Sequence, residues 1–118
     1  MPAFGRDGLL KRTEIEVVAN YVRSLSGLSV APGTNLAEGE KIFKANCVSC
    51  HGEKGNGNIE FGAPDLTDAI WLFGPDTEAI VEGLWNGRGG VMPVWNDRLD
   101  DATIKALAVY VHSLGGGR

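Results

Sequence analysis

The chain has 118 residues, a net charge of −4 and 43% hydrophobic residues, which suits one compact domain with a modest core. It holds no run of about 18 apolar residues, so we expect no membrane contact by this segment itself. The acidic balance argues against nucleic acid as a partner, because a domain that binds nucleic acid carries a basic face. With 17 glycines the chain is rich in loops, and such a small chain usually needs a disulfide, a metal or a cofactor to stabilise it.

The two ends of the chain resemble each other. Residues 1–27 begin Met-Pro-Ala-Phe and end Tyr-Val-Arg-Ser-Leu-Ser-Gly, while residues 92–116 begin Met-Pro-Val-Trp and end Tyr-Val-His-Ser-Leu-Gly-Gly. We interpret the copies as the ends of two homologous domains in tandem. Residues 1–27 would then be the C-terminal remnant of a preceding domain, and residues 36–118 a complete domain. Chance similarity between two amphipathic helices is the alternative.

The hydrophobic pattern predicts four helices and no strand. The first helix covers residues 13–25. Residues 28–35 are predicted to form a linker. At its end Thr34 or Asn35 could cap the next helix, over about 36–48. Residues 52–75 predict a loop, and a short helix follows over about 77–86. The last helix, over about 100–114 with Asp100 as its cap, repeats the apolar stripe of the first. The predicted fold class is therefore all-α, with an extra N-terminal helix.

The sequence Cys47-Val48-Ser49-Cys50-His51 carries the chemistry. Two thiols at this spacing can each add to one vinyl group of the same haem, and the adjacent imidazole then lies under the iron as an axial ligand. A thioredoxin-like redox pair would need a preceding strand, and a zinc site would need two further ligands. A disulfide at this spacing would stabilise little. The motif therefore predicts one covalently attached haem c as the cofactor.

The second axial ligand is sought among Met1, Met92 and His112. We favour Met92, which lies 41 residues after His51 and follows a glycine-rich loop that lets the backbone approach a haem edge. Its thioether would be a soft, neutral ligand that raises the reduction potential. Packing in the core is the alternative role for a methionine.

Further residues are candidates for the haem pocket. Arg88 is placed to pair with a haem propionate, although a solvated loop arginine is an equal alternative. Apolar walls could come from a set that equally suits an ordinary core: Phe43, Ile59, Phe61, Leu66, Trp71, Leu72, Phe73, Leu84, Trp85, Val91 and Trp95. No catalytic set is apparent, and an iron closed by Met92 suits one-electron transfer rather than catalysis.

The spacing of Cys-x-x-Cys-His and Met-Pro resembles the class I cytochrome c family. Residues 62–74, residues 86–95 and the two repeats are similar, more specifically, to the dihaem subunit III of cbb3-type cytochrome c oxidases (CcoP or FixP), and the resemblance covers the whole chain. It implies a cytochrome c domain of three to four helices around the haem. It also implies that the carbonyl of Pro64 accepts a hydrogen bond from the His51 ring and that Met92 is the distal ligand.

The resemblance also implies a setting. The intact subunit would have a membrane anchor and two haem domains on the periplasmic side of a bacterial inner membrane, with the other oxidase subunits and a donor cytochrome as partners. This chain lacks the anchor and the first Cys-x-x-Cys-His, so residues 1–27 would pack on the complete domain, pair with another copy, or remain loosely held. A haem domain of another multihaem complex is the nearest alternative function, and a haem gas sensor or peroxidase with an open sixth position is a different one.

Overall fold

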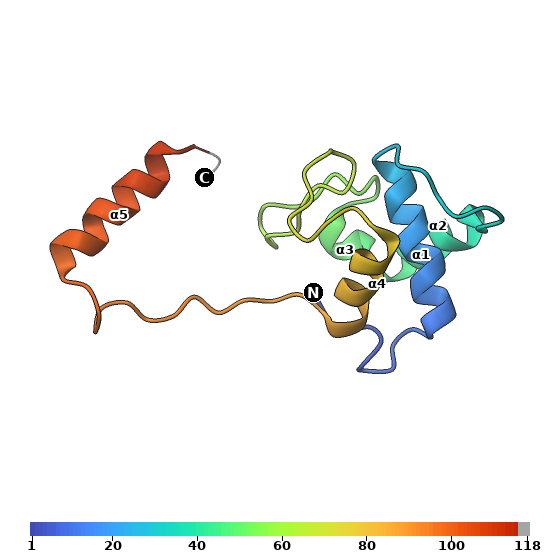
Figure 1. Cartoon of the computed structure of the whole chain (residues 1–118), viewed down its shortest axis with the longest axis horizontal. Coiled ribbons are helices and arrows are strands. Elements are labelled where there is room, and N and C mark those ends of the chain that lie inside the picture. The colour runs from blue at the N-terminus through green and yellow to red at the C-terminus, as the bar shows by residue number, and fades with distance from the viewer. Residues whose placement is uncertain (116–118) are drawn as a thin grey trace.

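The computed structural model describes residues 1–115, and these residues form five helices and no strand (Figure 1). The helices are α1 (Arg12–Leu25), α2 (Leu36–Asn46), α3 (Val48–His51), α4 (Thr77–Asn86) and α5 (Asp101–Ser113). The predicted all-α class is confirmed, and so is the loop between His51 and α4. Gly116, which ends the second repeat, lies outside the described residues, as do the last two residues assigned to the complete domain. None of the helices in residues 1–115 has the length and hydropathy needed to cross a bilayer.

Side-chain caps fix where two of the helices begin. Asn35, rather than Thr34, caps α2, because its side-chain oxygen accepts a hydrogen bond from the Glu38 N–H at 3.1 Å. Asp100 caps α5 by accepting from the Thr103 N–H at 2.9 Å, and hydrogen bonds from Thr103 lower the pKa of the Asp100 carboxyl. The helix predicted over 36–48 ends at Asn46, and Cys47 separates it from the short helix α3.

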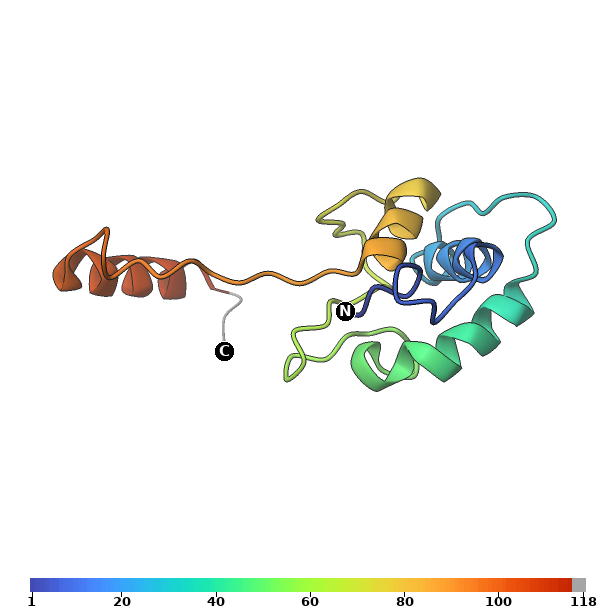
Figure 2. The ribbon, with the colours of Figure 1, turned by 90° about the horizontal axis from the view of Figure 1, so that it is seen from below.

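The core lies where α1 packs between α2 and α4 (Figures 1 and 2). Gly39 of α2 allows a close crossing, since a Cβ atom there would stand 2.6 Å from Cβ of Tyr21. The Tyr21 ring in turn meets Phe43 of α2 at a centroid distance of 5.5 Å. The buried apolar side chains come from α1, α2, α4 and the segments beside them: Phe4, Ile15, Val18, Ala19, Val22, Ile42, Phe43, Cys47, Val81 and Leu84.

The C-terminal helix lies apart from this core. Residues 87–100 form no helix and lead away from the end of α4, and α5 contacts none of the other four helices (Figures 1 and 2). Residues 1–27 thus follow the first of the three alternatives, packing on residues 36–86. In this structure α1, and not α5, packs against α2 and α4. The domain boundaries at residues 27 and 35 stay a prediction.

Candidate functional site

The two cysteines and the adjacent histidine lie on one tight turn at the junction of α2 and α3. The Cys47 N–H continues the α2 pattern by donating to the Phe43 carbonyl at 2.8 Å. The Cys47 carbonyl then accepts from the N–H groups of Cys50 at 3.1 Å and His51 at 2.9 Å. These backbone hydrogen bonds fix the relative positions of the residues that carry the two thiols and the imidazole. Both thiols are free, with Cys47 buried and Cys50 exposed.

The imidazole of His51 is oriented by the loop that follows it. Its Nδ1 atom lies 3.1 Å from the carbonyl oxygen of Pro64. A carbonyl oxygen can only accept, so Nδ1 carries the proton and Nε2 keeps its lone pair for a metal. This is the contact that the family resemblance implied. The role of His51 as an iron ligand stays a prediction.

Backbone hydrogen bonds hold Pro64 in this place. Asn58 and Ala63 pair in both directions at 2.9 Å, which closes the loop between them. The Leu66 N–H then donates to the Gly55 carbonyl at 2.7 Å, and the Leu66 side chain packs against the core. The His51 carbonyl accepts from Gly57 at 2.8 Å. Both sides of Pro64 are therefore tied to residues 55–58, and Gly57 ties this segment to His51 at the end of α3.

Gly57 is a site residue that the sequence did not reveal. It has a φ of +79°, and a Cβ atom there would stand 2.8 Å from both the Ala63 carbonyl oxygen and the Asp65 nitrogen. A side chain would therefore push away the backbone on both sides of Pro64. The only sequence signal was the general richness of this loop in glycine, which does not distinguish Gly57 from its neighbours.

We expect Gly57→Ala to destabilise the fold more than Gly62→Ala does. Gly62 also has a positive φ, of +61°, but a Cβ atom there meets nothing within 4 Å, so its substitution should cost only the left-handed strain of ~1–2 kcal/mol. Gly57→Ala should add overpacking of ~1–3 kcal/mol. Denaturant unfolding of the two variants measures the difference. Equal free energies of unfolding would contradict the close approach described for Gly57.

The two thiols differ in their surroundings. Cys47 is 8% exposed, and burial, with a smaller contribution from the nearby Cys50, raises the pKa of its thiol to about 11. A neutral, buried thiol is a poor nucleophile toward reagents in solution.

We therefore expect Cys50 to be alkylated well before Cys47 in the folded, haem-free chain at pH 8. With a pKa of about 11, only about one Cys47 thiol in a thousand is ionised at that pH. Iodoacetamide labelling followed by peptide mass spectrometry gives the two rates. The urea-unfolded chain is the control, in which both rates should become similar. Equal rates in the folded chain would contradict the burial of Cys47.

The loop beside α3 exposes apolar side chains in a way that fits a flat apolar cofactor. Four of them are between 63% and 83% exposed: Ile59, Phe61, Leu72 and Phe73. An open cavity of about 540 Å³ is lined by residues 56–59 and 63–65, which include Pro64. Several exposed apolar groups in the loop that follows such a turn are typical of a binding surface. The two thiols, the imidazole and these side chains together suit a covalently attached haem.

The other predicted site residues are not brought together with His51. Met92 is 80% exposed and lies in the extended segment beyond α4, and Trp95 in the same segment contacts Arg98. Arg88 remains at the end of α4, where its guanidinium stacks 3.9 Å from the centre of the Phe73 ring. Beside it lies Met1, whose carbonyl accepts from the Arg88 N–H at 3.2 Å. The first residue of the first repeat thus lies at the end of α4.

The described residues hold no second candidate metal site built from His, Cys, Asp or Glu. In residues 1–115, no three His, Cys, Asp or Glu side chains gather in a way that could hold a metal ion. The turn from Cys47 to His51 is therefore the candidate site that the described part of the chain offers.

Known proteins resemble this chain over its whole length. The model of the family described as "Cytochrome C oxidase, cbb3-type, subunit III" matches residues 34–111. The cbb3-type cytochrome c oxidase subunit FixP of Bradyrhizobium diazoefficiens is 64% identical over 118 residues, and that of Azorhizobium caulinodans is 57% identical over 120. Subunit CcoP of Azospirillum brasilense is 49% identical over 122 residues.

These matches take in 100% of this chain but only 40% or 41% of each relative, so the chain spans about two fifths of their length. The family match includes the turn from Cys47 to His51, the loop that carries Pro64, and α4. With a family model over most of its residues and relatives this similar, the chain belongs to the cbb3-type cytochrome c oxidase subunit III family.

Proposed function

We propose that this chain is a one-electron carrier that holds one covalently attached haem c. The observation that carries the proposal is the His51 ring, held by the Pro64 carbonyl at 3.1 Å beside two free thiols on the same turn. Membership of a cytochrome c family implies the same cofactor. When bound, the haem would supply an iron that changes reversibly between its ferric and ferrous states.

The residues of the chain would bind, orient and shield that group. Cys47 and Cys50 would form the two thioether bonds, and Nε2 of His51 would bind the iron from one side. The Pro64 carbonyl would keep the proton on Nδ1, which makes the imidazole a better donor. Met92 would bind from the other side, and apolar side chains of the loop, Leu66 among them, would exclude water. Arg88 and Trp95 stay candidate neighbours of the haem.

We place this carrier in a cbb3-type oxidase, as the second haem domain of its dihaem subunit. The printed names of the relatives and the position of the match, with the repeat of residues 1–27 ahead of it, support this placement. The partners would be the other oxidase subunits and a donor cytochrome. Covalent haem attachment suits the periplasmic side of a bacterial inner membrane, where cysteine chemistry runs under oxidising conditions.

A second candidate function follows from the exposure of Met92. If its sulfur stayed in the extended segment, the iron would have an open sixth position, as a gas sensor or a peroxidase requires. The two functions differ in how fast the ferrous haem binds carbon monoxide. A six-coordinate carrier should bind it slowly or not at all, whereas an open site should bind it rapidly.

A pyridine haemochrome assay on the mature protein tests the cofactor, and we expect one haem per chain. Optical spectra of the same sample test the coordination: we expect low-spin ferric and ferrous haem and little reaction with carbon monoxide. A colourless protein with two alkylatable thiols would overturn the proposal. A high-spin ferrous haem that binds carbon monoxide at once would favour the sensor or peroxidase.

A further inference from the structure

The side chain of Arg88 lies against both α4 and the loop that precedes it. A Cβ atom at Gly83, a buried residue of α4, would stand 3.1 Å from Nε and 3.7 Å from Cζ of Arg88. The centre of the Phe73 ring lies 3.9 Å from the same Cζ atom. This contact of Arg88 with Phe73 and Gly83, the Arg88 stack, therefore joins the loop, the helix and the segment that follows the helix.

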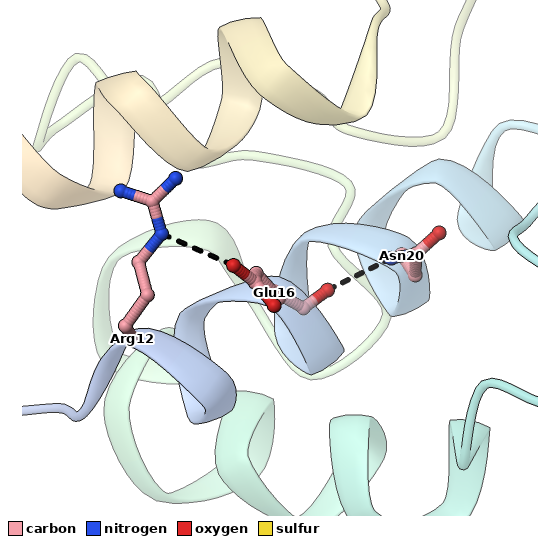
Figure 3. A network of polar contacts seen from close by, with 3 residues as sticks. All are labelled: Arg12, Glu16 and Asn20. Atoms are coloured by element: carbon pink, nitrogen blue, oxygen red, sulfur yellow. Dashed lines mark hydrogen bonds and ion pairs between the residues drawn. The ribbon is translucent and has the colours of Figure 1, made fainter.

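Two other arginines of residues 1–115 lie over aromatic rings, but less closely. Arg12 lies 5.6 Å from the centre of a tryptophan ring of α4, and Glu16 also holds it in an ion pair of 3.1 Å (Figure 3). Arg98 lies 5.4 Å from the centre of another tryptophan ring. Arg88 forms no ion pair with a carboxylate in the described part of the chain. Its guanidinium is thus held by the aromatic ring and the surface of α4.

The Arg88 stack lies at the start of the segment that carries Met92. Met92 follows Arg88 by four residues, and glycine occupies two of the three positions between them. Four residues span at most about 14 Å, so the place at which Arg88 is held limits where the Met92 sulfur can reach. The two glycines let this segment bend, whereas the stack fixes the point from which it starts.

We propose that Arg88 is a positioning residue for the Met92 ligand, and that it acts through the Phe73 ring rather than by pairing with a haem propionate. The proposal rests on the proposed function, because it needs an attached haem with Met92 on its iron. While the stack holds Arg88, less conformational freedom is lost when Met92 binds. Without the stack, the start of the segment is released and Met92 leaves the iron more often.

Carbon monoxide binding by the reduced, haem-loaded chain measures how often Met92 leaves the iron, because the sixth position must be open. Phe73→Leu removes the ring, and Arg88→Lys removes the planar guanidinium, while both keep the net charge. We expect each change to raise the rate of carbon monoxide binding by about threefold to tenfold. Phe73→Tyr keeps an aromatic ring and should bind carbon monoxide at the rate of the unchanged chain.

The double variant distinguishes one shared stack from two separate contacts with the haem. If Arg88 and Phe73 act through the Arg88 stack, the double variant should bind carbon monoxide no faster than the faster single variant. Separate contacts, with a propionate for Arg88 and with the haem face for Phe73, would multiply the two effects and overturn the proposal. Arg98→Lys is the matched control, because Arg98 also lies over a ring but follows Met92. Its rate should be unchanged, and an increase as large as that of Arg88→Lys would also overturn the proposal.

Digestion of the haem-loaded chain with trypsin reads the stack without relying on the iron. Trypsin must take the arginine side chain into its own specificity pocket, so we expect slow cleavage after Arg88 and fast cleavage after the exposed Arg98. Phe73→Leu should speed cleavage after Arg88 by about threefold to tenfold and leave cleavage after Arg98 unchanged. Cleavage after Arg88 as fast as after Arg98 in the unchanged chain would overturn the proposal. A chain without covalent haem would instead contradict the proposed function, and its pyridine haemochrome assay would show this separately.

Discussion

Replacing both Cys47 and Cys50 with serine is expected to abolish covalent retention of haem by this chain. Each thiol is proposed to form one thioether bond, and residues 1–118 contain no other cysteine to replace them. A serine hydroxyl is far less nucleophilic than a thiolate and makes no such bond. Only the coordinate bonds from His51 and Met92 would then hold the group, and denaturation breaks them.

The measurement is the haem stain of the unfolded protein on a denaturing gel, with a mass spectrum of the intact chain. The double variant should lose the stain and the added mass of one haem, and each single variant should keep only one bond. Ser49→Ala is the matched control, because Ser49 lies between the two cysteines and is exposed. Haem that stays on the unfolded double variant would disprove the proposed attachment.

The sequence predicted α1, α2, α4 and α5, but not the short α3, because each of these four carries its own local signals. The apolar stripes of α1 and α5 and the caps at Asn35 and Asp100 depend on neighbouring residues alone. The position of Pro64 beside His51 could not be derived in that way. It came from the family resemblance, because the contact joins residues 13 apart through a loop without regular structure.

Two further features could not be predicted from local signals. Periodicity predicts that one face of α1 is buried but not what buries it, and α5, which carries a similar apolar stripe, packs against no other helix. The packing of α1 also involves long-range contacts, such as that of Arg23 with Pro75, which no local pattern predicts. The requirement for glycine at position 57 likewise arises from backbone atoms of residues 63–65, which approach it only after the loop has closed.

Replacing Met92 with leucine is expected to lower the reduction potential of the haem-loaded chain by on the order of a hundred millivolts or more, within the roughly 0.8 V that axial ligands set. A thioether favours ferrous iron, and leucine offers no lone pair in its place. The same change should open the sixth position, so that ferrous haem binds carbon monoxide quickly. Potentiometric titration and carbon monoxide binding measure the two effects.

Met1→Leu, expressed behind a cleavable leader peptide, is the matched comparison, because Met1 and Met92 begin the two repeats. With Met92 as the ligand, Met1→Leu should leave the potential and the carbon monoxide reaction unchanged. The two methionines have different surroundings in the structure. Met1 is hydrogen-bonded to Arg88 at the end of α4, whereas Met92 is 80% exposed. If Met1→Leu lowered the potential while Met92→Leu did not, the first repeat would supply the thioether and the assignment of Met92 would be wrong.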